Sequence, residues 1–246
     1  MPIFFVIRVI KDGNLNSVTY FCASMKKYAI IVAGGIGTRM ETSIPKQFLL
    51  LNSKPLLYYT LNTFLKSYTD LHIILVLPDE HVAAGQEIID AFFDYDRIKI
   101  TIGGRTRFHS VQNGLKLVEE ESIVFVHDAV RCLLTADLIT RCYDTALEYG
   151  SAVPVVDSKD SVRMINGNDN TALERANIKL VQTPQTFHSK VLLPAFNIDY
   201  KDKFTDEATV VEAFGLKIQL VKGEENNIKI TQPLDMILAE SILLQQ

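Results

Sequence analysis

The chain has no tryptophan and only three cysteines among its 246 residues. Cys22, Cys132 and Cys142 are odd in number and form no Cys-x-x-Cys pair, which argues against a disulfide framework and against a structural zinc site. Free thiols are typical of proteins in a reducing compartment, so we expect a cytoplasmic protein.

The sequence also has no large excess of one charge and no long apolar run. Its 25 Lys and Arg residues against 29 Asp and Glu residues give a formal net charge of -4, which offers no broad basic field for nucleic acid. The apolar stretch Ile3 to Ile10 contains Arg8 and is too short to span a bilayer. We therefore expect no nucleic-acid partner, no membrane span and no signal peptide with a clean cleavage site.

Residues 1–24 are predicted to form an N-terminal extension outside the core, because Met25 is followed at once by a strongly patterned strand. Translation could begin at Met25, and the extension would be either disordered or an added edge strand. Residues 25–246 then form one domain, a length that allows a single sizeable α/β core.

Five short runs rich in valine and isoleucine alternate with longer segments of helical periodicity. The runs are continuously apolar, which suits strands that are buried on both faces of a sheet. Their order predicts an α/β fold, a Rossmann-like and mostly parallel sheet flanked by helices. The expected strands are YAIIVA (28–33), HIILVL (72–77), IKITI (98–102), SIVFVH (122–127) and SAVPVV (151–156), and the expected helices are 46–66, 79–93, 106–119 and 135–149.

Residues 157–178 interrupt this regular order. The segment is polar and has a strong turn signal at Asn166-Gly167 between two short β-prone pieces, so it predicts a protruding hairpin arm. A polar two-stranded arm is barely stable alone, and either a contact with a second subunit or a mobile surface hairpin fits the pattern. Beyond the arm we expect a helix opened by Thr205 or Asp206, a strand over 216–221 and a final helix beginning near Pro233.

The first apolar run leads into a glycine-rich turn, AGGIGTRM (33–40). Glycines let backbone N–H groups approach an anion closely, and Arg39 and Lys46 add positive charge for a polyphosphate. The turn lacks the Gly-Lys-Ser/Thr ending of a P-loop, and Met40 stands where a dinucleotide fingerprint has its third glycine. A polyphosphate site and a merely tight strand-to-helix connection both fit this turn.

Two more clusters follow later strands of the expected sheet. In GGRTRFHS (103–110) the glycines and Ser110 could hold a base edge and Arg107 a phosphate, although the segment also reads as an ordinary helix start. In HDAVR (127–131) Asp128 is placed to hold Mg²⁺ or a hydroxyl and Arg131 a phosphate. An aspartate at a strand end is also a common turn former or helix cap, and we interpret His127 as structural.

Further polar clusters occur at TPQ (183–185), TDEA (205–208) and NIKIT (227–231), where Lys229 is a lone cation in an otherwise apolar piece. The acids after Thr205 could simply cap a helix, and a strand lysine commonly points to solvent. Among the motifs sought, Ser-His-Asp, Cys-His, His-Glu-x-x-His and EF-hand patterns are all absent. Hydrolysis through a covalent nucleophile is therefore not indicated.

Taken together, the order and spacing of these clusters resemble the 2-C-methyl-D-erythritol 4-phosphate cytidylyltransferase family from about Lys27 to Glu240. The matching segments are AGGIGTRM with PKQF, GGRTRFHSV, VHDAVR, ERANIKLVQTPQTF, FTDEATVVEAFG and VKGEENNIKITQPLDMILAE. The resemblance implies a fold of the nucleotide-diphospho-sugar transferase type. It also implies transfer of CMP from CTP to 2-C-methyl-D-erythritol 4-phosphate, which gives 4-diphosphocytidyl-2-C-methyl-D-erythritol and pyrophosphate in the non-mevalonate route to isoprenoid precursors.

The resemblance further implies a role for each matching residue. Those expected to bind CTP are Ala33, Gly34, Gly35, Gly37, Arg39 and Lys46 around the triphosphate, Gly104, Arg105 and Ser110 facing cytosine, and Asp128 at the ribose or the metal. Those expected to hold the sugar phosphate are Asp128, Arg131, Thr183, Thr205 and Lys229, and the expected catalytic residues are Arg39, Lys46 and Lys229. Mg²⁺ would be the cofactor, held mainly by the CTP phosphates. In this family the arm is exchanged between the subunits of a homodimer, so Arg175 would reach the partner's active site.

The sequence departs from the family pattern in a few places and leaves rival functions open. Arg105 stands where an acidic residue is common, so a backbone rather than a side-chain contact to cytosine is expected there. Ribitol-5-phosphate cytidylyltransferase shares AGGIG, PKQF and HDAVR, whereas the intact TDEA segment favours the erythritol enzyme. An NAD-binding dehydrogenase could use Asp79 or Glu80 on a ribose, and a non-catalytic nucleotide-binding module could use the same sheet.

Overall fold

The computed structural model describes residues 25–35, 40, 44–93, 95–119 and 121–245. Residues 1–24 lie outside this range, so the predicted extension stays a prediction. Among the described residues the main sheet has the strand order β10-β7-β11-β6-β1-β4-β5, and β12 pairs with β7. Its strands are β1 (Lys26–Val32), β4 (Leu71–Leu77), β5 (Ile98–Ile102), β6 (Ser122–Asp128), β7 (Ser151–Asp157), β10 (Lys179–Val181), β11 (Gln185–His188) and β12 (Leu220–Lys222).

The central strands of this sheet are parallel, as expected. β1 pairs in parallel with β4 and with β6, and β4 pairs in parallel with β5. Only toward one edge does the direction change, where β11 runs antiparallel to β6 and β7, and β10 antiparallel to β7, within the described part of the chain. The five apolar runs of the sequence are therefore all strands, and the predicted α/β fold is confirmed.

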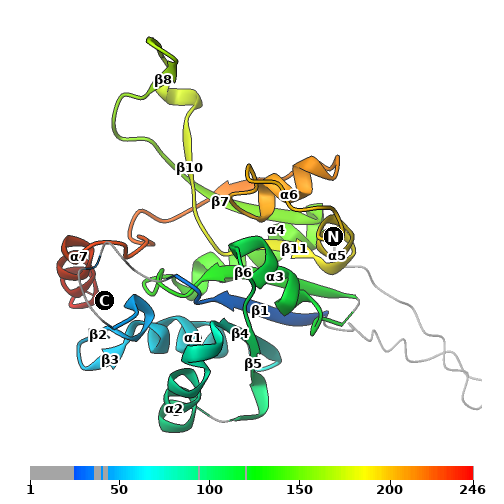
Figure 1. Ribbon diagram of the computed structural model, residues 1–246, viewed down its shortest axis with the longest axis vertical. Helices are drawn as coiled ribbons and strands as arrows, with labels where there is room; N and C mark the ends of the chain where they lie inside the picture. Colours follow the sequence, from blue (N-terminus) through cyan, green and yellow to red (C-terminus); the bar gives the residue numbers. More distant parts are fainter. Residues whose placement is uncertain (1–24, 36–39, 41–43, 94, 120, 246) are drawn as a thin grey trace, which may run out of the picture.

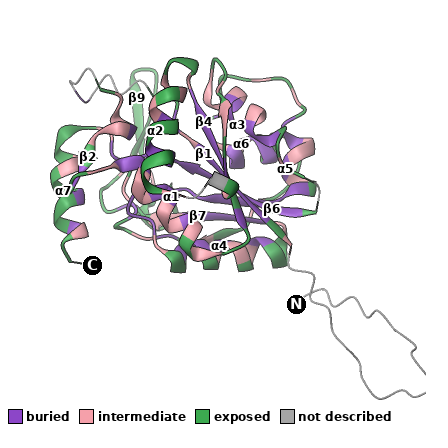
Figure 2. Ribbon diagram, turned by 90° about the horizontal axis from the view of Figure 1, so that it is seen from below, coloured by how far each residue is buried: buried purple, intermediate pink, exposed green. Residues whose placement is uncertain are grey.

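Helices cover both faces of the sheet, which explains why its central strands β1, β4 and β6 are largely apolar along their length. Alternate residues of β1 point to opposite faces, with Ile31 in one apolar cluster and Ile30 in the other. One cluster includes side chains of α1 (Leu56–Ser67), α2 (Val82–Phe92) and α4 (Ala136–Tyr149); the other includes those of α3 (Arg107–Leu115), α5 (Ser189–Ala195) and α6 (Glu207–Ala213). In Figure 2 the buried colour runs along β1, β4 and β6 between these helices. Burying each large aliphatic or aromatic side chain stabilises the fold by about 1.5–3 kcal/mol.

The predicted helix over 46–66 is wrong in its first half. Lys46–Phe48 is a short 3-10 turn (η2), and β2 (Leu50–Leu51) and β3 (Lys54–Pro55) then form a small hairpin. Its turn residues Asn52 and Ser53 have positive φ angles of 45° and 64°. This left-handed conformation is incompatible with a right-handed helix. Pro55 then stands just before α1, where its fixed φ suits a helix start.

Other element boundaries also differ from the prediction, and the helix predicted over 79–93 begins with a 3-10 turn, η3 (Asp79–His81), before α2. α3 ends at Leu115 rather than near residue 119, and β12 begins only at Leu220 rather than at residue 216. Asp206 is confirmed as the N-cap of α6, where its side chain accepts a hydrogen bond from the Thr209 N–H at 2.9 Å. The final helix, α7 (Pro233–Leu243), has proline in its first turn as expected.

The arm predicted for 157–178 projects from the body of the protein (Figure 1). β8 (Arg163–Asn166) and β9 (Asp169–Ala172) pair around Gly167, whose φ of 60 explains the glycine at this turn. Every residue of both strands is exposed. The short helix η5 (Arg175–Asn177) and β10 then lead the chain back to the sheet.

The three predicted free thiols are partly accounted for: Cys132 and Cys142 are free and buried, and Cys22 lies outside the described residues. Within the described ranges, no helix has the length and apolar character needed to cross a membrane.

Candidate active site

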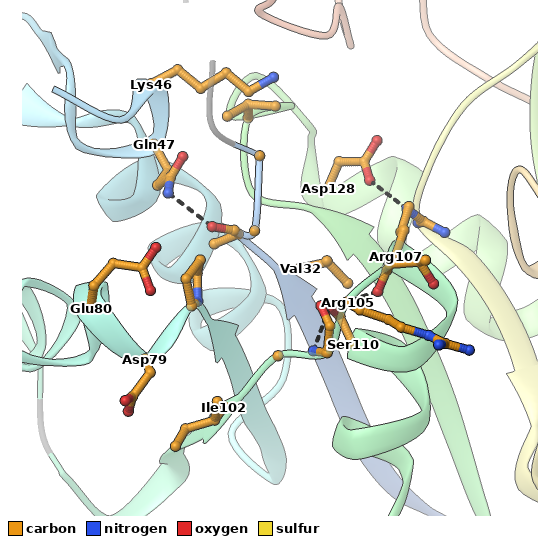
Figure 3. A pocket seen from close by; sticks show the side chains of 18 of the residues that line it. Val32, Lys46, Gln47, Asp79, Glu80, Ile102, Arg105, Arg107, Ser110 and Asp128 are labelled. Atoms are coloured by element: carbon orange, nitrogen blue, oxygen red, sulfur yellow. Dashed lines mark hydrogen bonds and ion pairs between the residues drawn. The ribbon is translucent and has the colours of Figure 1, made fainter. Parts of the chain in front are cut away.

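A pocket of about 520 Å³ opens where the parallel strands end (Figure 3). Val32 of β1 is the register partner of both Val76 in β4 and Asp128 in β6, so the loops after these strands meet at one edge of the sheet. The predicted site residues that line the pocket are Ala33, Gly34, Gly35, Lys46, Gly104, Arg105, Ser110, Asp128 and Lys229. Gly37 and Arg39 lie outside the described residues. Segments that are far apart in the sequence thus form one site.

The loop after β5 packs tightly on the start of α3. The Gly104 N–H donates to Ser110 Oγ at 3.1 Å, and the Ser110 hydroxyl donates to the Thr106 carbonyl at 3.0 Å. A Cβ added at Gly104 would lie 2.4 Å from His109 Cβ, so only glycine fits there. Arg105 is exposed beside it. The loop therefore lies close to α3 at the edge of the pocket, and recognition of a base edge by its backbone stays a prediction.

The side chain of Gln47 holds the start of the turn after β1 in place. This side chain is 1% exposed, and its amide donates to the Ala33 carbonyl at 2.8 Å. The side chain of the neighbouring Lys46 lies against Gly35: a Cβ added at Gly35 would be 3.2 Å from Lys46 Cε. No role was expected for Gln47 from the sequence, although its position next to a candidate phosphate-binding lysine was the available signal.

A cluster of paired charges forms the opposite side of the pocket, around Asp128. Lys229 Nζ lies 2.9 Å and Arg131 Nε 3.8 Å from Asp128 Oδ2, and Arg107 Nε lies 3.2 Å from Oδ1. Burial by itself would raise the pKa of Asp128, but the cations of Arg107, Lys229 and Arg131 outweigh this effect and hold the pKa well below its ordinary value. Asp128 is therefore a fixed anion that orients three cations.

Arg107 also pairs with the buried carboxylate of Glu207 at the start of α6. The two terminal nitrogens of its guanidinium lie 2.5 and 3.1 Å from the two Glu207 oxygens. Burial alone would lower the pKa of Arg107, but Glu207 and Asp128 raise it above the ordinary value. Burial raises the pKa of Glu207, and Arg107 opposes that rise. Arg107 was a candidate phosphate ligand from its sequence, whereas in the structure its guanidinium pairs with two carboxylates.

Behind this cluster, His127 and Thr183 form a buried hydrogen-bonded pair. His127 Nε2 lies 3.1 Å from the Arg131 carbonyl and Nδ1 lies 3.0 Å from Thr183 Oγ1. Burial lowers the pKa of His127 to about 3, so the ring is neutral. Since a carbonyl only accepts, Nε2 carries the proton and Nδ1 accepts from the Thr183 hydroxyl. The Thr183 oxygen in turn accepts from the Asp128 N–H at 3.2 Å, so Thr183 supports Asp128 from behind.

Arg131 is held by a second set of contacts. Its Nη1 donates to the Asn227 carbonyl at 2.9 Å, and the Asn227 amide donates to the Thr183 carbonyl at 2.8 Å. Asn227 is fully buried, and the sequence had placed it in the polar cluster NIKIT without a role of its own. The segment that carries Lys229 is thereby tied to the HDAVR segment.

The structure does not bring every predicted residue into this pocket, because Arg131 and Thr183 lie behind its lining. Thr205 is exposed just before α6, and it is absent from the lining. Arg175 is exposed on the arm, where its Nη1 donates to the Lys159 carbonyl at 3.2 Å. Asp79 and Glu80, by contrast, line the pocket after β4, although the sequence suggested them only for a dehydrogenase.

Comparison with known proteins identifies the family. The sequence profile of IspD, 2-C-methyl-D-erythritol 4-phosphate cytidylyltransferase, matches residues 27–245. The chain belongs to this family. The enzyme of that name from Phocaeicola vulgatus is 42% identical over 219 residues, which cover 89% of this chain and all of the relative. The one from Porphyromonas gingivalis is 43% identical over 219 residues, covering 89% of this chain and 98% of the relative.

Solved structures of the cytidylyltransferase family share the fold. The 4-diphosphocytidyl-2C-methyl-D-erythritol synthase of Anaerococcus prevotii superposes with a TM-score of 0.76 at 28% identity, covering 89% of this chain and 99% of that one. The 2-C-methyl-D-erythritol 4-phosphate cytidylyltransferase of Francisella tularensis has a TM-score of 0.73 at 32% identity, covering 88% and 99%. Membership in this family confirms the resemblance and shows that the protein is a nucleotidyltransferase. It also argues against the alternative of an NAD-binding dehydrogenase.

Proposed function

We propose that this pocket transfers CMP from CTP to 2-C-methyl-D-erythritol 4-phosphate, the acceptor, and releases pyrophosphate. The observation that carries the proposal is the meeting, in one pocket, of a glycine-rich turn with Lys46 and a cation cluster around Asp128. The first suits a nucleoside triphosphate and the second a phosphate monoester. CTP as a substrate follows from the family.

In the reaction an acceptor phosphate oxygen attacks the α-phosphorus of CTP. A new P–O bond forms, the bond between the α- and β-phosphates breaks, and pyrophosphate leaves with the electron pair. A phosphate monoester has a second pKa of about 6 and is largely ionised at neutral pH, so no general base is required. The structure supports this mechanism, because His127 beside Asp128 is buried and neutral, with both ring nitrogens engaged.

Catalysis then depends on positioning and on charge. Lys46 would contact the triphosphate above Gly35, and the backbone near Gly104 would face cytosine. Lys229 and Arg131, both fixed on Asp128, would hold the acceptor phosphate and neutralise the charge that develops at the α-phosphate. Arg39 is proposed for the leaving pyrophosphate from the sequence resemblance alone.

Mg²⁺ fits this site as a cation carried by CTP. Both Asp128 oxygens already lie near cationic side chains, and the described residues include no group of three or more His, Cys, Asp or Glu side chains that could hold a metal. Mg²⁺ commonly binds through substrate phosphates with one or two carboxylates. Asp128 would be its protein ligand by exchanging a cation contact, and the ion would polarise phosphate oxygens.

A homodimer with exchanged arms forms part of the proposal. The arm exposes apolar side chains, with Ile165 at 68% and Met164 at 45% exposure, and Arg175 does not line the pocket of its own chain. Both facts support a role for Arg175 in the pocket of a second copy. We expect sedimentation to show a dimer.

Mixing two inactive variants tests the exchange. If Arg175→Ala and Lys229→Ala subunits are unfolded and refolded together, half of the dimers are mixed and each mixed dimer has one intact site. About a quarter of wild-type turnover should return under such statistical pairing. No recovery in mixtures that sediment as mixed dimers would contradict the exchange.

The acceptor is tested by pyrophosphate release with CTP and Mg²⁺, run in parallel with 2-C-methyl-D-erythritol 4-phosphate and ribitol 5-phosphate. Turnover with the erythritol compound supports the proposal. Turnover with ribitol 5-phosphate alone would keep the chemistry and replace the acceptor, whereas CTP binding without release from either would leave a non-catalytic nucleotide-binding module.

A further inference from the structure

Glu207 is a buried acid that has no task in the reaction proposed above. It is the first residue of α6, its side chain is 1% exposed, and Arg107 pairs with both of its oxygens. A buried carboxylate is costly unless it is paired with good geometry. The pair lies beside the pocket rather than in the apolar core, because Arg107 lines the pocket.

Arg107 connects three segments that are far apart in the sequence. It is the first residue of α3, its terminal nitrogens bind Glu207 from α6, and its Nε lies 3.2 Å from Asp128 Oδ1 at the end of β6. All three guanidinium nitrogens therefore point at protein carboxylates. The planar fork of arginine can hold two carboxylates in fixed directions, which the single ammonium of lysine cannot do.

This arrangement determines which oxygen of Asp128 faces the acceptor side. Arg107 takes Oδ1, and Lys229 and Arg131 approach Oδ2. Figure 3 shows Asp128 and Arg107 directed toward each other at the edge of the pocket. If Oδ1 lost its partner, the carboxylate could rotate and Lys229 and Arg131 would lose their common anchor.

We propose that Arg107, held in place by Glu207, is a positioning residue that fixes Asp128 so that Lys229 and Arg131 meet the acceptor phosphate. The inference rests on the proposed function, since it assumes that Lys229 and Arg131 bind the acceptor. Arg107 itself does not contact the reacting atoms. The competing explanation is that the Arg107–Glu207 pair only stabilises the fold.

Replacing both members of the pair separates these explanations. Arg107→Met alone leaves Glu207 buried without its guanidinium and should destabilise the protein. The double variant Arg107→Met/Glu207→Met removes both charges and keeps similar side-chain lengths, and such apolar replacements of buried ion pairs are often neutral or stabilising. The double variant should regain thermal stability and still leave Oδ1 of Asp128 without Arg107.

The measurements are thermal unfolding, CTP affinity by calorimetry, and kcat and KM for each substrate in the full-length protein. For the double variant we expect kcat to fall roughly 10- to 100-fold, the size typical of a misplaced catalytic group, with a raised acceptor KM. CTP affinity, measured without Mg²⁺ so that Asp128 does not act as a metal ligand, should fall less than acceptor affinity, because the glycine-rich turn is untouched. Arg107→Lys should retain more stability than Arg107→Met and lose kcat in the same way.

Arg97→Met is the matched control, because Arg97 is also a structural arginine. It donates to the Leu65 and Tyr68 carbonyls at 3.3 and 3.0 Å, and it does not line the pocket. It should lower thermal stability and leave kcat unchanged. A stable double variant with wild-type kcat would overturn the positioning role, as would an equal loss of CTP affinity and acceptor affinity. Lys229→Ala is measured beside it: normal turnover there would refute the site assignment itself, whereas a slow Lys229→Ala with a normal double variant refutes only the inference about Arg107.

Discussion

The two sides of the pocket are built on different principles. In the anchored wall, Asp128, Arg107 and Lys229 line the pocket, and Arg131 and Glu207 pair with them from outside its lining, so these side chains are fixed on one another. The backbone wall is formed by the turn at Gly34 and Gly35 and the loop at Gly103 and Gly104. At these four glycines the main chain lines the pocket without a side chain. Under the proposed function, the charged side chains would hold the acceptor phosphate, and the glycines would leave room for the close approach of the nucleotide.

Loss of a cation from the anchored wall should have the largest effect. Lys229→Ala should lower kcat by about 100-fold or more, the usual cost of removing a group that stabilises developing charge. Its side chain is 42% exposed, so the melting temperature should stay close to that of wild type. Lys217→Ala, at an exposed lysine outside the pocket, is the control and should keep full turnover. Equal kcat for the two variants would contradict a role for Lys229 in stabilising the developing charge.

The support behind the anchored wall predicts a pH dependence of stability. The folded-state pKa of His127 is about 3, below the ordinary 6.5, so the unfolded chain takes up a proton that the folded chain refuses as pH falls below 6.5. This contribution to stability is intact above pH 6.5, is lost progressively below it, and is fully lost near pH 3. Between pH 7 and 5 the loss should be about 2 kcal/mol.

The measurement is urea unfolding of wild type and His127→Asn at several pH values. The variant lacks this proton uptake, so the difference in unfolding free energy between the two proteins should shrink by about 2 kcal/mol from pH 7 to 5. His72→Asn, at an exposed histidine on β4, should follow wild type. A constant difference between wild type and His127→Asn would show that His127 is not held neutral.

The backbone wall should respond to added bulk rather than to loss of charge. In Gly104→Ala the new Cβ would meet His109 at 2.4 Å, so the loop must move away from α3. We expect the KM for CTP to rise by about tenfold, which is about 1.4 kcal/mol, while the acceptor KM changes less. Steady-state kinetics with each substrate varied in turn checks this.

A second glycine in α3 provides the matched control for that prediction. In Gly114→Ala the new Cβ would lie 2.9 Å from Ile30 Cγ2 in the core, so the substitution also crowds α3. It should reduce stability by about 1–3 kcal/mol without a selective effect on CTP. If Gly104→Ala and Gly114→Ala changed the KM for CTP equally, the backbone wall would have no special role.

The backbone wall was the easier of the two to predict from the sequence. Glycines placed directly after apolar strands mark it in the printed order of residues, and the parallel sheet brings those loops together. The strands themselves were predictable because consecutive residues such as Ile30 and Ile31, which point to opposite faces of the sheet, are both apolar. Family resemblance then supplied substrates that no local pattern could name.

The anchored wall could be predicted only in part, because its contacts join residues distant in the sequence. Arg107 and Glu207 are 100 residues apart, and nothing near either residue indicates the other. Asn227 and Gln47 were missed for the same reason, since a buried polar side chain is recognised only once its surroundings are known. The first part of the helix expected over 46–66 was wrong because the turn at Asn52 and Ser53 was overlooked among apolar residues of helical spacing.

The most direct test of CMP transfer by positioned cations is the turnover of Lys46→Ala with saturating CTP and acceptor. Lys46 lines the pocket against Gly35 of the backbone wall, and in the proposed reaction it contacts the triphosphate. We expect pyrophosphate release to fall by about 100-fold in a variant that unfolds at the wild-type temperature. Near-normal release from such a folded variant would contradict this expectation.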